Sequence, residues 1–215
     1  MTSILVSTAR SNRVDAIARR TSWVGCETLL PMSLAGPTPV GRWCHKLETM
    51  LDPLHLRHKP PETLERPREL VVVCAPMHSN INLSRIVRSC GCCGISKVIG
   101  CGSARIIEKI ARDGAETVVV ETHRTLEPVL KKLRAAGYCL VGLEQASTSE
   151  RLYDYRFQRR SALILGSERQ GLKDKFLASL DDIVEIPVYG LPYSHNVATA
   201  AAMAMYEYCR QFPHG

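Results

Sequence analysis

The stretch Leu70–Gly102, "LVVVCAPMHSNINLSRIVRSCGCCGISKVIGCG", decides the fold class of this chain. Its first part, "LVVVCAP", is a short apolar run rich in β-branched residues and predicts a buried strand, as does "SKVIGCG" near its end. Between them, "NLSRIVRSCGCCG" has a helical pattern that opens at Asn82, a residue type that often caps a helix. A strand, a helix and a strand in this order predict two parallel strands joined by a crossover helix.

The same alternation continues to the end of the chain. Further strands are predicted within residues 117–122, 138–145, 161–168 and 182–188. Further helices are predicted within residues 104–114, 125–137, 172–180 and 196–212, with Gly114 and Gly137 closing the first two. We therefore expect an α/β fold, in which helices cover both faces of a mostly parallel sheet.

The first 69 residues have a different character. They contain both tryptophans, Trp23 and Trp43, and seven of the twelve prolines. We interpret residues 1–69 as a basic, proline-rich arm and residues 70–215 as the main domain. Four arginines make the arm a candidate RNA contact through phosphates, and an arm that only packs on the domain is the alternative. These arginines are Arg10, Arg13, Arg19 and Arg20.

The overall charge favours a polyanionic partner. The chain of 215 residues carries 28 Lys and Arg against 21 Asp and Glu, a net charge of +7. From the pattern of its first twenty residues we expect neither a secretory signal nor a membrane span, and their Arg- and Ser-rich composition leaves a transit peptide as an alternative. Nine cysteines in such a chain do not predict a disulfide framework, so we expect a reducing cytoplasm.

Three loop-to-helix junctions follow predicted strands, where open parallel sheets bind ligands. They are "HSNINLSRIVRS" at 78–89, "LGSERQGL" at 165–172 and "YGLPYSHNVATA" at 189–200. In the second, Gly166 and Gly171 would let the backbone approach a ligand. Taken alone, the second junction is equally compatible with a plain strand-turn-helix connection with a capping acid, and the exposure usual for arginine favours a solvated helix face for Arg85 and Arg88.

Several other chemistries fit the sequence poorly. No Gly-Lys-Ser/Thr follows Gly171, no GxGxxG follows the first strand, and the glycine spacing around Ser167 is not that of a hydrolase nucleophile. The missing GxGxxG in particular argues against a nucleotide-binding oxidoreductase. The adjacent Ser194, His195 and Asn196 do not form a catalytic triad, whose members converge from distant segments. The cysteines near "CGCCG" have no second pair at zinc spacing, so no metal is expected.

Taken together and in this order, the junctions resemble the SpoU/TrmH family of the SPOUT superfamily, S-adenosylmethionine-dependent RNA ribose 2′-O-methyltransferases. The first motif is "NINLSRIVRS", with Asn82 and Arg88, and the second is "LILGSERQGL", with Glu168. The third is "IPVYGLPYSHNVATAAA", where members usually have Ser-Leu-Asn-Val. The resemblance covers about residues 70–210. It implies a C-terminal trefoil knot, S-adenosylmethionine as cofactor, and a homodimer whose active site takes residues from the partner subunit.

The resemblance also implies roles for individual residues. Arg88 would activate the ribose hydroxyl, although a guanidinium pKa above about 12 makes it a demanding base. Asn82 and Glu168 would hold Arg88 and the substrate, and Ser194 and Asn196 would line the catalytic site. His195 replaces the usual leucine; it would stack on adenine or, as we prefer, fill the leucine space as a buried ring. The residues expected to bind the cofactor are Glu144, Gly166, Gly171, Ile186, His195 and Asn196.

The expected substrate is RNA. "GLEQAS" at 142–147 and "LGSERQGL" resemble the branch that methylates a D-loop guanosine of tRNA, and ribosomal RNA is the main alternative. A non-catalytic RNA-binding relative is a further alternative, which His195 suggests and the joint presence of Asn82, Arg88, Glu168 and Asn196 opposes. The alanines of the last helix suit close packing in the knot or between subunits. These are Ala198, Ala200, Ala201, Ala202 and Ala204.

Overall fold

The computed structural model describes residues 55–56 and 59–215. Residues 1–54 and 57–58 of the expected arm, with Arg10, Arg13, Arg19 and Arg20, lie outside the described residues. Residues 59–215 belong to one compact unit. Within it, Arg68 Nε donates to the carbonyl of Cys93 at 2.7 Å, so the residues just before the first strand pack on this unit. The domain boundary at residue 69 stays a prediction.

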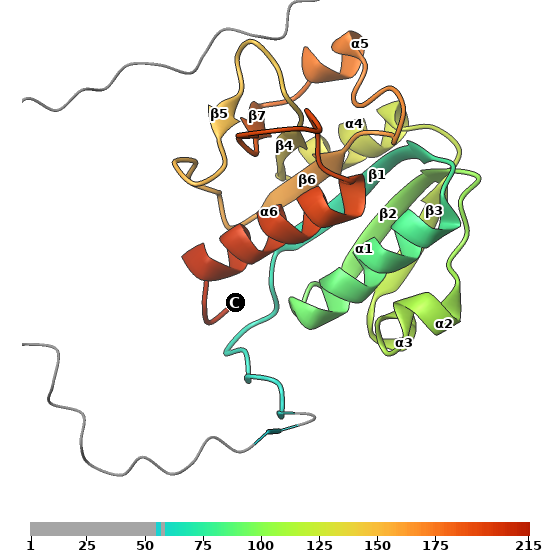
Figure 1. Ribbon diagram of the computed structural model, residues 1–215, viewed down its shortest axis with the longest axis vertical. Helices are drawn as coiled ribbons and strands as arrows, with labels where there is room; N and C mark the ends of the chain where they lie inside the picture. Colours follow the sequence, from blue (N-terminus) through green and yellow to red (C-terminus); the bar gives the residue numbers. More distant parts are fainter. Residues whose placement is uncertain (1–54, 57–58) are drawn as a thin grey trace, which may run out of the picture. The chain divides into compact units, whose positions relative to one another are not determined.

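A seven-stranded sheet forms the centre of the unit (Figure 1). Its strands are β1 (Leu70–Met77), β2 (Lys97–Gly102), β3 (Val119–His123), β4 (Cys139–Leu143), β5 (Glu150–Arg151), β6 (Ser161–Leu165) and β7 (Asp182–Glu185). They lie in the order β3-β2-β1-β6-β4-β7-β5, and each neighbouring pair is parallel. This confirms the expected parallel sheet, although the two-residue strand β5 was not foreseen.

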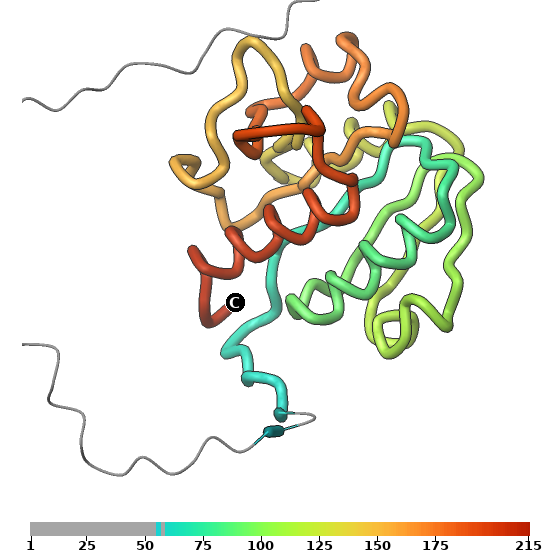
Figure 2. The backbone as a smooth tube through the Cα atoms, in the orientation of Figure 1, coloured from blue at the N-terminus to red at the C-terminus, as the bar shows by residue number. Residues whose placement is uncertain are grey.

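Among the described residues, five helices connect these strands and a sixth follows the last strand. They are α1 (Asn80–Cys92), α2 (Glu108–Ala111), α3 (Gly114–Thr117), α4 (Glu127–Ala135), α5 (Asp174–Leu177) and α6 (Val197–Gln211). Figure 2 follows the chain out of β7 and back into α6, so that residues 186–196 form a loop near the N-terminal end of α6. The strand order does not test the trefoil knot, which stays a prediction.

Strand β1 shows why the sheet needs helices on both faces. Leu70, Val72 and Cys74 belong to one apolar cluster, which contains Ile86 of α1 and Met205 of α6. The alternate residues Val71, Val73 and Ala75 belong to a second cluster with Val129, Leu130 and Leu133 of α4. Because both faces of the strand are covered, its sequence is an unbroken apolar run rather than an alternating one.

Two predicted helix ends were wrong. Ser79, not Asn82, caps α1, since the Ser79 side chain accepts from the backbone N–H of Asn82 at 3.2 Å. This leaves the Asn82 amide free to bond elsewhere. The helix predicted over 104–114 is two short helices, because Arg112 between them takes a left-handed φ of 51°. Gly114 therefore begins α3 instead of closing a helix, whereas Gly137 follows α4 with φ 79°, as expected.

The strand order predicts a ligand-binding crevice at the carboxyl-terminal ends of the strands. From β1 the chain builds outward through β2 and β3 on one side, and β6, β4, β7 and β5 lie on the other. In open sheets of this kind, ligands bind beyond the carboxyl ends of the strands where the order reverses. Here that point lies between β1 and β6, which are followed by the first and second junctions. Among the described residues, no helix is long and apolar enough to cross a membrane.

Candidate functional site

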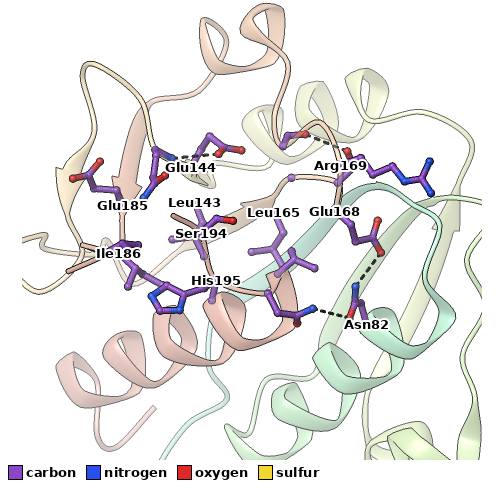
Figure 3. Close-up of a pocket in the computed structure, with 18 of the residues that line it drawn as sticks. Asn82, Leu143, Glu144, Leu165, Glu168, Arg169, Glu185, Ile186, Ser194 and His195 are labelled. Atoms are coloured by element: carbon purple, nitrogen blue, oxygen red, sulfur yellow. Dashed lines mark hydrogen bonds between the residues drawn. The ribbon is translucent and has the colours of Figure 1, made fainter. Parts of the chain in front are cut away.

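A pocket of about 530 Å³ opens at the carboxyl ends of β4, β6 and β7 (Figure 3). Its walls come from the ends of β4 and β6, the loop of residues 166–171, and the segment that runs from β7 into α6. The pocket is therefore built where parallel sheets bind ligands, and its volume falls in the range of about 300–1,000 Å³ that is typical of small-molecule sites.

A chain of hydrogen bonds joins all three junctions at one end of this pocket. Asn82 Nδ2 donates to Glu168 Oε1 at 3.2 Å, and Asn196 Nδ2 donates to Asn82 Oδ1 at 3.2 Å. Figure 3 shows the dashed line that links Glu168 to Asn82. Asn196 also caps α6, because its Oδ1 accepts from the N–H of Ala198 at 3.0 Å. Residues 86 and 114 positions apart thus become direct neighbours.

Glu168 is held as a carboxylate. Its Oε1 accepts from the backbone N–H of Ser79 at 3.1 Å, and its Oε2 accepts from that of His78 at 3.3 Å. Partial burial on its own raises the pKa of Glu168, but hydrogen bonds from its own backbone, Asn82, Ser79 and His78 outweigh it, so the pKa lies below its usual range. The carboxylate fixes the β1–α1 loop and orients the Asn82 amide. It does not cap the helix after its own strand.

The loop of residues 166–171 forms a tight cradle that only glycine allows. A Cβ on Gly166 would lie 2.5 Å from the carbonyl carbon of Gly171. Gly171 itself has φ 58°, and a Cβ there would meet Glu144 Oε2. The same Glu144 oxygen accepts from the backbone N–H of Leu172 at 2.8 Å. Glu144, Gly166 and Gly171 all line the pocket, so the structure brings these predicted residues together.

The segment after β7 supplies the opposite wall. Ile186, Ser194 and His195 line the pocket, as Figure 3 shows. His195 is exposed within this chain, so the expectation of a buried ring in the leucine space is wrong here. The physical reason is its place in the loop of residues 189–196, all of which are exposed. Its ring remains free to face a ligand in the pocket.

Arg88 is the predicted site residue that the structure does not bring to the pocket. It is exposed on α1, is not part of the pocket wall, and forms no hydrogen bond with Asn82 or Glu168 among the described residues. Asn82 and Glu168 bond to each other instead.

In the described part of the chain, no group of three His, Cys, Asp or Glu residues is arranged to hold a metal ion.

Several pocket residues were not foreseen from the sequence. Six apolar ones form much of the wall, and Glu185 accepts a hydrogen bond from Ser149 Oγ at 2.6 Å. The apolar residues are Leu143, Leu165, Val188, Pro192, Val197 and Ala200. The sequence offered one signal for Leu143 and Leu165, which is their position at the ends of predicted strands. They are the last residues of β4 and β6 and therefore face the crevice beyond those strands.

The SpoU rRNA Methylase family matches residues 69–206 of this chain. A mouse protein named tRNA (guanosine(18)-2′-O)-methyltransferase TARBP1 is 34% identical over 66% of this chain, which corresponds to 9% of the mouse protein. The Escherichia coli K12 tRNA (guanosine(18)-2′-O)-methyltransferase is 28% identical over 68% of this chain and 65% of its own length. This chain therefore matches less than two thirds of either relative.

Other similar proteins extend the comparison. A Burkholderia 23S rRNA (guanosine-2′-O-)-methyltransferase RlmB is 27% identical over 96% of this chain and 81% of its own length. The solved structure of an A. aeolicus TrmH/SpoU tRNA modifying enzyme has a TM-score of 0.65 and 25% identity, covering 70% of this chain and 78% of that one. AviRb from Streptomyces viridochromogenes, solved in complex with the cofactor AdoMet, has a TM-score of 0.60 and 27% identity over 70% and 63% of the two chains.

Proposed function

Because the chain belongs to the SpoU rRNA Methylase family, we propose that it is an S-adenosylmethionine-dependent methyltransferase acting on RNA ribose 2′-hydroxyls. The observation that carries the proposal is the hydrogen-bond chain from Glu168 through Asn82 to Asn196. It joins the three motifs at the mouth of a pocket of suitable size. The chain has retained both the motifs and the geometry that connects them, which argues against a non-catalytic relative.

The pocket fits S-adenosylmethionine. Gly166 and Gly171 have no side chains, so their backbone polar groups lie close to the cavity. Ile186 and Leu165 provide an apolar wall for the adenine base of the cofactor. Glu144, His195 and Asn196 would complete the contacts. When bound, the cofactor supplies a sulfonium methyl group that is already activated. The protein then needs to align the ribose hydroxyl with it and to accept one proton.

We place Arg88 in the site of the partner subunit. It is exposed on α1 and outside the pocket of its own chain, so a second copy of the chain would be needed to bring it to the reacting hydroxyl. Exposed residues recur along one stripe of α1 at positions 81, 85, 88 and 92, and along one stripe of α6 at positions 199, 203, 206 and 210. These stripes include Ile81, Met203 and Tyr206, which are 46%, 40% and 59% exposed. Apolar side chains at helical spacing support a homodimer contact there.

The substrate class we favour is tRNA, with ribosomal RNA as the alternative. The mouse and Escherichia coli relatives carry names that specify tRNA guanosine 18, whereas the Burkholderia relative carries an rRNA name. The net charge of +7 suits either RNA. The proposal also includes the C-terminal trefoil knot, an RNA-contacting role for the basic arm, and a cytoplasmic location.

The test is methyl transfer from tritiated S-adenosylmethionine to unmodified tRNA and to rRNA, offered separately. We expect label in tRNA, released as a 2′-O-methylnucleoside, and a loss of at least about 100-fold in the Arg88→Ala variant if this group orients the hydroxyl. Arg85→Ala, on the same exposed stripe of α1, is the matched control: it should lose far less activity if Arg88 acts on the hydroxyl, and a comparable amount if Arg88 only holds the subunits together. Label in rRNA alone would overturn the tRNA assignment, and no transfer together with no cofactor binding would overturn the enzyme proposal.

A further inference from the structure

A second cavity, of about 700 Å³, lies on the other side of the loop of residues 166–171. Its wall comes from the end of β1, the start of α4, and the segment from Ser167 to Phe176. Ser167, Arg169 and Gly171 line both this cavity and the first pocket. A molecule that lies across this loop therefore contacts the two cavities at once.

The second cavity is strongly cationic. Four positively charged side chains and one carboxylate contribute to its wall, which leaves an excess of three positive charges. The cations are Lys131, Arg169, Lys173 and Lys175, and the carboxylate is Glu127. Glu127 already pairs with Lys131 at 2.9 Å, and no described residue forms an ion pair with the other three. Figure 3 shows Arg169 extending away from Ile186 and His195, the far wall of the first pocket.

The floor of this cavity is apolar. Leu126 is buried and Phe176 is half-buried, and both line the cavity. Lys175 Nζ lies 4.7 Å from the centroid of the Phe176 ring, so a cation and an aromatic face are presented together. A cationic rim above an apolar floor matches the two parts of a nucleotide, whose phosphate seeks cations and whose base seeks an apolar or aromatic surface.

We propose that this cavity binds a nucleotide of the RNA strand adjacent to the one whose ribose is methylated. The inference rests on the proposed function, because the methylated nucleotide has to lie at the Asn82 and Glu168 end of the first pocket. From there, the strand reaches the second cavity by crossing the shared residues Ser167 and Arg169. A phosphate above the rim competes with Glu127 for Lys131 and meets the three cations that have no partner among the described residues.

The test compares Lys131→Glu with Lys132→Glu. Both lysines are exposed neighbours on α4, but only Lys131 lines the cavity. A Lys173→Gln/Lys175→Gln double variant removes two further cations without adding a negative charge. For each protein we would measure the affinity for a single-stranded RNA octamer by fluorescence anisotropy, the KM and kcat for unmodified tRNA, and the Kd of S-adenosylmethionine by calorimetry. Thermal unfolding would confirm that every variant is folded.

We expect Lys131→Glu and the double variant to weaken octamer binding and raise the KM for tRNA by about tenfold, through lost phosphate contacts. The kcat and the Kd of S-adenosylmethionine should stay unchanged, and Lys132→Glu should behave as wild type. Equal losses in Lys131→Glu and Lys132→Glu would reduce the effect to the general positive field and overturn the subsite. Binding of guanosine monophosphate as tightly as the octamer would overturn the assignment to an RNA strand.

The two proposals fail in different ways. If the wild-type protein methylates RNA while the cavity variants keep its KM, the subsite is wrong and the proposed function stands. If the wild-type protein transfers no methyl group but the cavity variants still lose octamer affinity selectively, the proposed function is wrong and the cavity remains an RNA-binding site. Cross-linking of a 4-thiouridine octamer to the peptide that contains Phe176 would support the subsite directly.

Discussion

At the scale of single residues, Glu168 has the most specific role, because one carboxylate accepts from His78, Ser79 and Asn82. In Glu168→Gln, an amide NH₂ group replaces one acceptor oxygen and faces N–H donors. We expect the kcat/KM for RNA to fall at least about tenfold, since Asn82 loses its orientation. The Kd of S-adenosylmethionine should change little. Calorimetry and methyl-transfer kinetics on the purified variant would measure both.

The pH dependence of stability gives Glu168 a second readout. Its pKa is lowered on folding, so its contribution to stability is present above the unfolded pKa, about 4.3, and is lost as the pH falls through the folded pKa. The Tm of Glu168→Gln should therefore lie below that of the wild type at pH 7 and approach it only as the pH falls below the unfolded value of about 4.3 and through the folded pKa. Glu116→Gln, at an exposed position on α3, is the control. A Tm difference that stays constant with pH would contradict this account.

At the scale of elements, the packing of α3 against α1 depends on Gly114. A Cβ at this position would lie 2.9 Å from the carbonyl oxygen of Val87 and 3.0 Å from the Cα of Arg88. Because both are backbone atoms, Gly114→Ala should destabilise the fold by about 1–3 kcal/mol. Gly190→Ala, whose Cβ would meet nothing within 4 Å, should be nearly neutral. Urea denaturation of the two variants decides the matter, and equal destabilisation would rule out the packing explanation.

The same elements show how far sequence patterns reach. The core strands were predictable because runs such as Leu70–Cys74 are apolar on both faces, which a doubly covered sheet requires. The break at Arg112 was not, because a left-handed φ in a residue other than glycine is imposed by tertiary packing. In the site, the three motifs identified Asn82, Glu168 and Asn196. Their direct hydrogen bonds depend on the topology, which places the ends of β1, β6 and β7 at the same edge of the sheet.

At the scale of the whole molecule, Arg88 lies outside the pocket of its own chain, and under our proposal this would make catalysis a property of the dimer. Heterodimers of two inactive variants test this. One subunit carries Arg88→Ala, and the other carries Ala200→Leu, which enlarges a side chain that lines the pocket and should abolish cofactor binding. Each variant alone should be inactive. The heterodimer, isolated through two different affinity tags, should recover roughly half of the wild-type activity, because one of its two sites pairs an intact pocket with an intact Arg88.

The heterodimer separates action across the subunit contact from action within one chain. If Arg88 served the pocket of its own chain, every site in the mixed dimer would lack either the arginine or the pocket, and no activity would return. A heterodimer of Arg88→Ala with wild type is the control for tagging and should also keep roughly half of the activity under either arrangement. Tyr206→Glu, on the exposed stripe of α6, should yield monomers by light scattering. Those monomers should still bind S-adenosylmethionine, since the pocket is complete within one chain, but they should transfer no methyl group because Arg88 no longer reaches it.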